Sequence, residues 1–171
     1  QPFVQLNGSA PHRDNKQRKT DKAAKPDTRV LIVEDNPDVR SFIREVLEHQ
    51  YHVIEATDGK EGLIQVGNYL PDLIIADIMM PEMDGITFNR EVKKDPAISS
   101  IPLIFLTAKS TRDNELEGLV EGADDYITKP FDPALLKARV NNLIESRLRL
   151  RNLLQSDPRS VDQENITFLS S

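Results

Sequence analysis

Five polar side chains, Glu34, Asp35, Asp77, Thr107 and Lys129, each stand at the end of a short apolar run. The three acids offer carboxylate oxygens, which hard divalent cations such as Mg²⁺ prefer. An aspartate can also act as a nucleophile and form an acyl phosphate, while a lysine ammonium and a threonine hydroxyl can donate to phosphoryl oxygens. These residue types therefore suit the transfer of a phosphoryl group to a carboxylate beside a metal ion.

The three acids would repel one another if the fold brought them together. Two like charges about 4 Å apart repel by about 4 kcal/mol at an effective dielectric constant near 20. Three anions in one pocket would therefore oppose folding unless a cation neutralised them. An all-oxygen ligand set with few protein contacts favours Mg²⁺, which keeps several waters and is commonly shared with a substrate phosphate. We therefore expect Mg²⁺ as the cofactor.

Short apolar runs predict the strands that must position these residues. The first run, Arg29 to Val33, has the uninterrupted β-branched and leucine content that is typical of a strand buried on both faces. The other predicted strands are Tyr51 to Glu55, Leu73 to Ala76, Pro102 to Leu106 and Asp125 to Thr128.

Helical periodicity separates the apolar runs. The clearest predicted helix carries its apolar residues on one face, namely Val39, Phe42, Ile43, Val46 and Leu47. The other predicted helices are marked by Leu63, Val66 and Leu70, by Ile86 and Val92, by Leu116, Leu119 and Val120 before Gly122, and by Leu135, Leu136, Val140, Leu143 and Ile144 after Asp132 and Pro133.

Strand and helix alternate five times between Thr28 and Leu150. This alternation predicts an α/β fold, a doubly wound (βα)5 three-layer sandwich in which helices cover both faces of a five-stranded parallel sheet. In the flavodoxin-like arrangement, with strand order 2-1-3-4-5, the first and third strands are neighbours. The acids after these two strands would then meet at the carboxyl edge of the sheet, where such folds bind their ligands.

Each site residue also has a simpler interpretation. Asp35 could cap the helix that follows it. Thr107 could be an ordinary hydroxyl at a strand end, and Lys129 a solvated lysine. Asp77 is harder to explain in this way, because no helix begins near it before Gly85.

Composition sets the class of protein. The chain has 171 residues, 38% of them hydrophobic, which suits a single core. It has no cysteine, which excludes disulfides and thiol chemistry and fits a cytoplasmic location, and it has neither a secretory signal nor an apolar run long enough to span a membrane. The net charge of −6 is concentrated between two basic tails. We therefore expect a soluble domain with no membrane contact and no direct nucleic acid binding.

Four linked motifs resemble the receiver domain of bacterial response regulators. They are Val30–Asn36, Asp77–Gly85, Leu106–Ala108 and Gly122–Phe131. The resemblance covers about residues 28–150 and shows no departure at the family's core positions. It implies a phosphoacceptor domain of a two-component phosphorelay. Such a domain is no enzyme for external substrates: it takes a phosphoryl group from a kinase histidine, changes conformation and controls a downstream output, here expected to be transcription.

The resemblance also assigns roles by position. Asp77 would be the phosphoacceptor, and Glu34 and Asp35 would be the acidic pair for Mg²⁺. Asp77 and the backbone carbonyl of Met79 would complete the metal ligands. Met79 and Lys109 would occupy the positions that tune the lifetime of the phosphoryl group.

Lys129 would contact the phosphoryl group and precede Pro130 in a cis peptide bond. Thr107 and Tyr126 would form the switch pair, in which the hydroxyl moves toward the phosphoryl oxygens and the ring turns inward behind it. A plain core-filling role for Tyr126 stays open.

The chain ends suggest a larger parent. We expect residues 1–27 to be a flexible linker and residues 151–171 an extension toward an output domain, the segment 162–169 resembling a connector to an arabinose-regulator-type helix-turn-helix domain. Basic flanks and the absence of methionine before Met79 favour a receiver excised from a hybrid sensor kinase. Leucines continue the last helical pattern to Leu154, as a connecting helix or as a solvated helix end.

The expected partner is a histidine kinase phosphodonor domain, which could lie in the same parent chain. A homodimer could form through the fourth helix, the fifth strand and the fifth helix, near Arg112, Asp124 and Arg139.

Three rival functions remain to be separated. A phosphohydrolase of the haloacid dehalogenase type expects a second aspartate two positions after the nucleophile, where this chain has Met79. In a flavodoxin, Glu34 and Asp35 would repel the cofactor phosphate. A degenerate receiver, used only for docking, would not need the full set of acids, threonine and lysine.

Overall fold

The computed structural model describes residues 27–108 and 122–156. These residues form the strands β1 (Arg29–Val33), β2 (His52–Ala56), β3 (Leu73–Asp77), β4 (Leu103–Ala108) and β5 (Asp125–Lys129), and the helices α1 (Pro37–Leu47), α2 (Gly59–Tyr69), α3 (Gly85–Lys94) and α5 (Pro133–Gln155). The helix predicted around Leu116, Leu119 and Val120 lies outside the described residues, as do Lys109, Arg112 and most of both tails.

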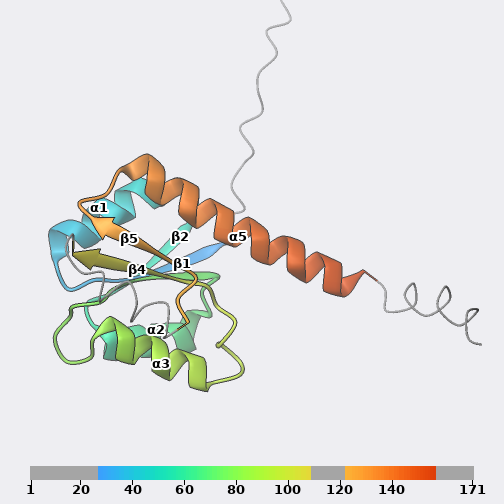
Figure 1. The fold of residues 1–171 in the computed structure, drawn as a ribbon, viewed down its shortest axis with the longest axis horizontal. Coiled ribbons are helices and arrows are strands. Elements are labelled where there is room, and N and C mark those ends of the chain that lie inside the picture. The colour runs from blue at the N-terminus through green and yellow to red at the C-terminus, as the bar shows by residue number, and fades with distance from the viewer. Residues whose placement is uncertain (1–26, 109–121, 157–171) are drawn as a thin grey trace, which may run out of the picture.

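The strands make one parallel sheet in the order β2-β1-β3-β4-β5, which confirms the predicted topology. Helices α1 and α5 cover one face of this sheet, and α2 and α3 cover the other (Figure 1). The first and third strands are therefore direct neighbours. The side chains that follow them are brought to one edge, as the sequence predicts.

Two apolar clusters, one on each face, hold the sheet between its helices. Successive side chains of a strand point to opposite faces. Val30 and Ile32 of β1 accordingly pack toward α1 and α5, while Leu31 and Val33 pack toward α2 and α3. All four are fully buried. The continuous apolar run of β1 is thus explained by burial on both faces, and β1 is a rigid base for the residues that follow it.

The cap of α1 corrects one reading of the sequence. The side chain of Asn36 accepts hydrogen bonds from the backbone N–H groups of Asp38 and Val39, at 2.9 and 3.2 Å. Asn36 is therefore the N-cap, and Asp35 is not needed for that purpose. On the apolar face of the helix, Ile43 and Leu47 are buried, but Phe42 is 40% exposed.

Two leucines that were predicted to face the core are also exposed. Leu70 ends α2 as its C-cap in a left-handed conformation, with φ of 47°, and this turn directs its side chain outward. Leu135 precedes Leu136 on α5, where the buried line runs through Leu136, Val140 and Ile144. A helix turns about 100° per residue, so Leu135 falls off that line.

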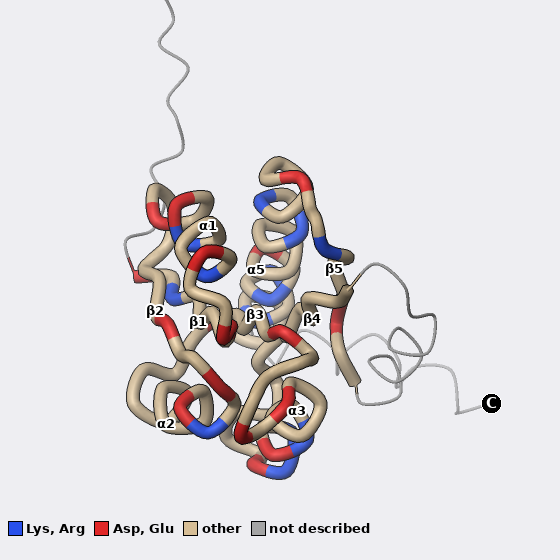
Figure 2. The backbone as a smooth tube through the Cα atoms, turned by 90° about the vertical axis from the view of Figure 1, so that its left-hand side faces the viewer, with Lys and Arg blue, Asp and Glu red and all other residues tan. Residues whose placement is uncertain are grey.

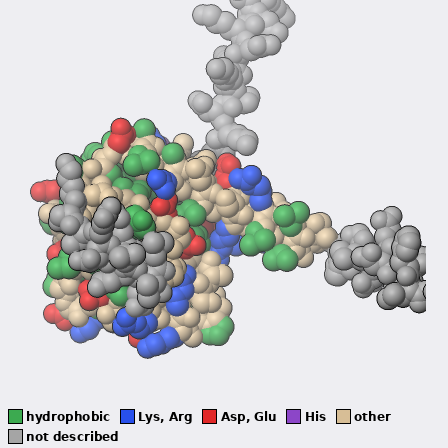
Figure 3. Space-filling view, viewed as in Figure 1, with side chains coloured by type: hydrophobic (Ala, Val, Ile, Leu, Met, Phe, Trp, Pro, Cys, Tyr) green, Lys and Arg blue, Asp and Glu red, His purple; other side chains and the backbone are tan. Residues whose placement is uncertain are grey.

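Helix α5 continues past the globular body to Gln155 (Figure 1). Leu150, Leu153 and Leu154 on this extension are all exposed, and Figure 3 shows hydrophobic side chains gathered on the projecting helix. Within residues 27–108 and 122–156, no helix is both long and apolar enough to cross a membrane.

Candidate functional site

Asp77 is the last residue of β3. The predicted strand ended one residue earlier, at Ala76, with Asp77 after it. The ladder continues one residue further, since Asp77 pairs with Leu106 of β4. Its side chain is almost buried, with 7% of the residue exposed. Gly85, at the start of α3, packs against the backbone carbonyl of Asp77, where any side chain would collide. This close approach fixes the position at which β3 ends and the following loop begins.

Glu34 and Asp35 leave β1 in different directions. The N–H of Glu34 donates to the carbonyl of Ala56 at 3.0 Å, so Glu34 extends the pairing with β2. Its carboxylate is fully buried and accepts from the N–H of Asn36 at 3.0 Å. Asp35 is exposed. The turn thus presents one buried and one solvent-facing acid.

The three predicted metal ligands converge. One carboxylate oxygen from each of Glu34, Asp35 and Asp77 can be chosen so that all three lie within 4.8 Å of one another. Figure 2 faces the carboxyl edge of the sheet, with acidic segments beyond β1 and β3. Three hard oxygens at this spacing fit a small divalent cation such as Mg²⁺.

Lys129 ends β5 and reaches into the same cluster. Its ammonium lies 2.8 Å from Glu34 Oε2 and 3.0 Å from Asp77 Oδ2. Burial opposes the charged form of Lys129, but the hydrogen bonds to Glu34 and Asp77 and the charges of these two acids together outweigh it and raise the pKa of the ammonium. Lys129 is therefore a fixed cation beside two acids. The peptide bond that joins it to Pro130 is cis, the isomer that the family resemblance implies.

The buried carboxylate of Glu34 is electrostatically unfavourable. Burial raises its pKa, and nearby Asp77 adds to this effect. The hydrogen bonds from Lys129 and from the N–H of Asn36 act in the opposite direction without cancelling it. One lysine thus compensates the acid cluster only in part, and a further cation would be stabilising there.

Arg40 of α1 contacts the turn that carries Glu34, and this contact was not predicted. Its Nη1 donates to the backbone carbonyl of Glu34 at 2.7 Å, and its Nε lies 3.3 Å from Glu55 Oε1 on β2. The other oxygen of Glu55 lies 3.6 Å from Nη1 of Arg44. A signal was present in the sequence: Glu55 is an acid inside an apolar run, and such an acid needs a partner.

Thr107 and Tyr126 lie on adjacent strands. Thr107 is buried, with 2% exposed, and pairs with Thr128 in the ladder, while Tyr126 pairs with Phe105. Tyr126 is half-buried and packs against the cluster under α2 and α3. This contact is compatible with both readings of Tyr126, as a switch residue and as core filler.

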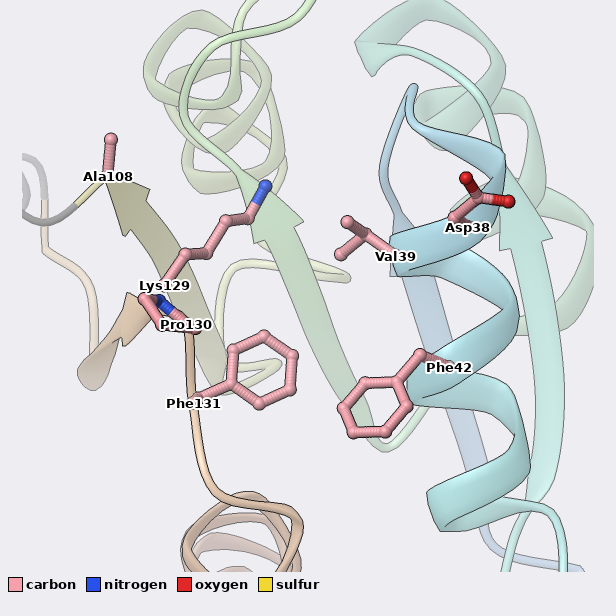
Figure 4. Close-up of a pocket in the computed structure, with 7 residues that line it drawn as sticks. All are labelled: Asp38, Val39, Phe42, Ala108, Lys129, Pro130 and Phe131. Carbon is pink, nitrogen blue, oxygen red and sulfur yellow. The ribbon is translucent and has the colours of Figure 1, made fainter.

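A cleft of about 580 Å³ opens beside Lys129, and it was not predicted. Figure 4 shows the rings of Phe42 from α1 and Phe131 from the β5–α5 loop next to each other in its lining. Their centroids are 5.8 Å apart. The partial exposure of Phe42 is thereby explained, because its ring forms a wall of the cleft. Val39 and Pro130 add to this apolar lining.

The face expected to form a dimer is described only in part. Arg139 of α5 donates to both carboxylate oxygens of Asp125, at 2.9 and 2.7 Å. Asp124 instead accepts from the N–H of Leu103 at 2.8 Å, so its carboxylate is bound to its own chain. Dimer formation stays a prediction.

The sequence profile of the response regulator receiver domain matches residues 30–141. The chain belongs to this family. The receiver domain is 40% identical over 141 residues to histidine kinase P4 of Formosa agariphila, covering 82% of this chain and 10% of that protein. It is 41% identical over 116 residues to the phosphate regulon transcriptional regulatory protein PhoB of Pseudomonas aeruginosa, covering 67% of this chain and 51% of that protein.

Solved structures agree with this assignment. The signal receiver domain of a signal transduction histidine kinase from Syntrophus aciditrophicus superposes on this receiver domain with a TM-score of 0.66 and 37% identity. The superposition covers 70% of this chain and 91% of that one. The chain thus spans the receiver part of its relatives and only a tenth to a half of the two longer proteins named above.

Proposed function

We propose that this receiver domain accepts a phosphoryl group on Asp77 from a phosphohistidine of a partner kinase, with Mg²⁺ held by Glu34, Asp35, Asp77 and the backbone carbonyl of Met79. The observation that carries this proposal is the convergence of three acids and Lys129 at one edge of the sheet. An isolated ion pair would not require two further carboxylates beside it. A phosphoacceptor site would.

The two carboxylate oxygens of Asp77 are held differently. Oδ1 accepts from the N–H of Met79 at 3.3 Å, and Oδ2 accepts from the ammonium of Lys129 at 3.0 Å. Both contacts restrict the orientation of the carboxylate. When transfer occurs, the donor P–N bond breaks as a bond between phosphorus and an Asp77 oxygen forms, and the departing imidazole takes up a proton from solvent.

When bound, Mg²⁺ would supply positive charge to the transferred oxygens. Lys129 would donate a hydrogen bond to another of these oxygens, which requires its ammonium to leave Asp77. Thr107 lies on the neighbouring strand and would offer its hydroxyl. Tyr126 would then follow as the second half of the switch. The differential contacts of the phosphoryl group would provide the free energy for this change.

The cleft beside Lys129 would be the binding site for the phosphodonor domain. Its walls are mainly apolar, formed by Phe42 and Phe131 among others, and it opens next to the side chain that contacts Asp77. A histidine projecting from an amphipathic helix could place its ring at Asp77 while neighbouring apolar side chains enter the cleft. This surface therefore suits a histidine phosphodonor domain, in the cytoplasm and in the same parent chain or in another.

The output of the switch lies outside the described residues. Relatives include a histidine kinase and a transcriptional regulatory protein, so we propose a hybrid kinase parent that controls transcription. The projecting end of α5, with exposed Leu150, Leu153 and Leu154, would connect to the output domain.

Labelling followed by intact-mass measurement tests this function. With a small phosphodonor such as acetyl phosphate and Mg²⁺, the protein should gain the mass of one phosphoryl group. Asp77→Asn should gain none, whereas Asp124→Asn, an aspartate bound to the backbone at the other edge, should be labelled normally. Labelling of Asp77→Asn would disprove the assignment.

The same samples separate the rival enzyme. A phosphohydrolase would release phosphate from small phosphomonoesters over many turnovers, and this domain should not. Sustained turnover would favour the enzyme, and labelling with no effect on conformation would favour a docking role alone.

A further inference from the structure

We propose that Arg40, anchored by Glu55, is a positioning residue for the metal site, because it holds the turn from which Glu34 and Asp35 project. This inference rests on the proposed function, since it assumes that these acids bind Mg²⁺. It adds a residue that contacts neither the metal ligands' carboxylates nor the phosphoacceptor.

The carbonyl of Glu34 lies where the β-ladder stops. Glu34 donates to Ala56, so in a continuing parallel ladder its carbonyl would accept from the N–H of Asp58. Strand β2 ends at Ala56, however, and the chain then turns into α2, whose N-cap is Asp58. Arg40 supplies the missing donor from a different element, with Nη1 at 2.7 Å from that carbonyl. A guanidinium thus replaces a strand at this point.

Glu55 fixes the guanidinium in turn. Its two carboxylate oxygens contact Arg40 and Arg44 separately, at 3.3 and 3.6 Å. The side chain of Arg40 is only 18% exposed, so it has little freedom to leave this position. A planar guanidinium can contact a carbonyl and a carboxylate at once, which a lysine ammonium does less well.

The turn is therefore held from two sides. The N–H of Asn36 binds the carboxylate of Glu34, and Arg40 binds the carbonyl of the same residue. Within the described residues, no hydrogen bond holds the side chain of Asp35 in place. Its place in the acid cluster depends on the backbone, which Arg40 restrains.

Electrostatics and positioning predict opposite signs. Arg40 is a cation near the proposed Mg²⁺ site, so a purely Coulombic effect would make Mg²⁺ bind more tightly once that charge is removed. If Arg40 positions the turn, its removal should weaken Mg²⁺ binding instead. A purely structural role would lower the melting temperature and leave Mg²⁺ affinity unchanged.

The test is calorimetric Mg²⁺ titration of the unphosphorylated protein, comparing Arg40→Met with Arg44→Met. Arg44 lies on the same helix and contacts the same glutamate but has no hydrogen bond to the turn, so it is the matched control. We expect the Kd for Mg²⁺ to rise about 10-fold in Arg40→Met, the scale of effect seen for residues that orient metal ligands. Arg44→Met should bind Mg²⁺ like the wild type.

Two further variants complete the experiment. Arg40→Lys, which keeps the charge but not the planar fork, should show a smaller rise in Kd. Glu55→Gln should also raise the Kd, but it removes a negative charge as well, so Arg40→Lys, in which the charge is unchanged, serves if Arg40→Met does not fold. The labelling rate of each variant should recover at saturating Mg²⁺. Unchanged or tighter Mg²⁺ binding in folded Arg40→Met and Glu55→Gln would overturn the inference, whereas absence of Mg²⁺ binding in the wild type would instead refute the proposed function.

Discussion

The two edges of one sheet treat charged side chains in opposite ways. At the amino edge, Arg147 donates to the carbonyl of Asp72 at 3.2 Å, and Lys93 donates to the carbonyls of Ser99 and Ile101 at 2.8 and 3.2 Å. Each of these cations donates hydrogen bonds to backbone carbonyls. At the carboxyl edge, three acids lie close together, and Lys129 contacts two of them.

This difference indicates which edge serves the fold and which serves a ligand. Buried polar groups with backbone partners stabilise a structure, whereas clustered like charges oppose it. The cations at the amino edge therefore stabilise the fold. The acids at the carboxyl edge still repel one another, and a bound cation can relieve that repulsion. Mutations at the two edges should accordingly affect different properties.

The largest expected effect is on labelling, at the carboxyl edge. Asp35→Asn removes an exposed acid from the cluster and should slow phosphoryl labelling of Asp77 by about 100-fold at low Mg²⁺, because the metal loses a ligand. Circular dichroism should show an unchanged fold. Normal labelling kinetics at limiting Mg²⁺ would show that Asp35 is only a surface acid.

A smaller effect, on stability alone, is expected at the amino edge. Arg147→Met should lower the free energy of unfolding by about 1 to 2 kcal/mol, because the carbonyl of Asp72 loses its donor. Urea denaturation measures this loss. The labelling rate of the folded variant should not change, and a slower rate at saturating Mg²⁺ would mean that the two edges are coupled.

The smallest expected effect is a gain in stability at the carboxyl edge, opposite in sign to the loss expected at the amino edge. Because burial raises the pKa of Glu34, the stability that its protonated form contributes is present below about pH 4.3, the ordinary glutamate value, and is lost as the pH rises through the folded-state pKa. Glu34→Gln should therefore make the metal-free protein more stable at pH 7, because the buried amide is neutral where the carboxylate is charged.

Denaturation of the metal-free wild type and of Glu34→Gln across pH 4 to 8 would check this sign. The advantage of the variant should shrink toward the acidic end, where the wild-type carboxyl is itself protonated. Added Mg²⁺ should stabilise the wild type and not the variant. A variant that is less stable at every pH would mean that the ion pair of Glu34 with Lys129 outweighs burial.

The topology was predictable because the buried strands leave a plain record in the sequence. β1 and β3 are apolar at nearly every position, since both of their faces are covered, and the polar residues at their ends stand out against that background. The alternation of strands and helices then fixes a parallel sheet. Glu34, Asp35 and Asp77 could be brought together on this basis alone.

The remaining details depend on local backbone geometry that periodicity does not encode. Asn36 and Asp35 are equally good caps by residue type, and Asn36 is the cap because the helix begins at Pro37. The contact of Arg40 with Glu34 depends on where β2 ends. The cleft lined by Phe42 and Phe131 requires the relative placement of α1 and the β5–α5 loop, which no single segment specifies.

Calorimetric titration of the wild-type protein with Mg²⁺, alongside Asp35→Asn and Arg147→Met, tests the central claim most directly. We predict one Mg²⁺ per chain in the wild type and in Arg147→Met, and strongly weakened binding in Asp35→Asn. A folded wild-type protein that takes up no Mg²⁺, or an Asp35→Asn variant that binds it equally well, would contradict a metal-dependent phosphoacceptor site at this edge.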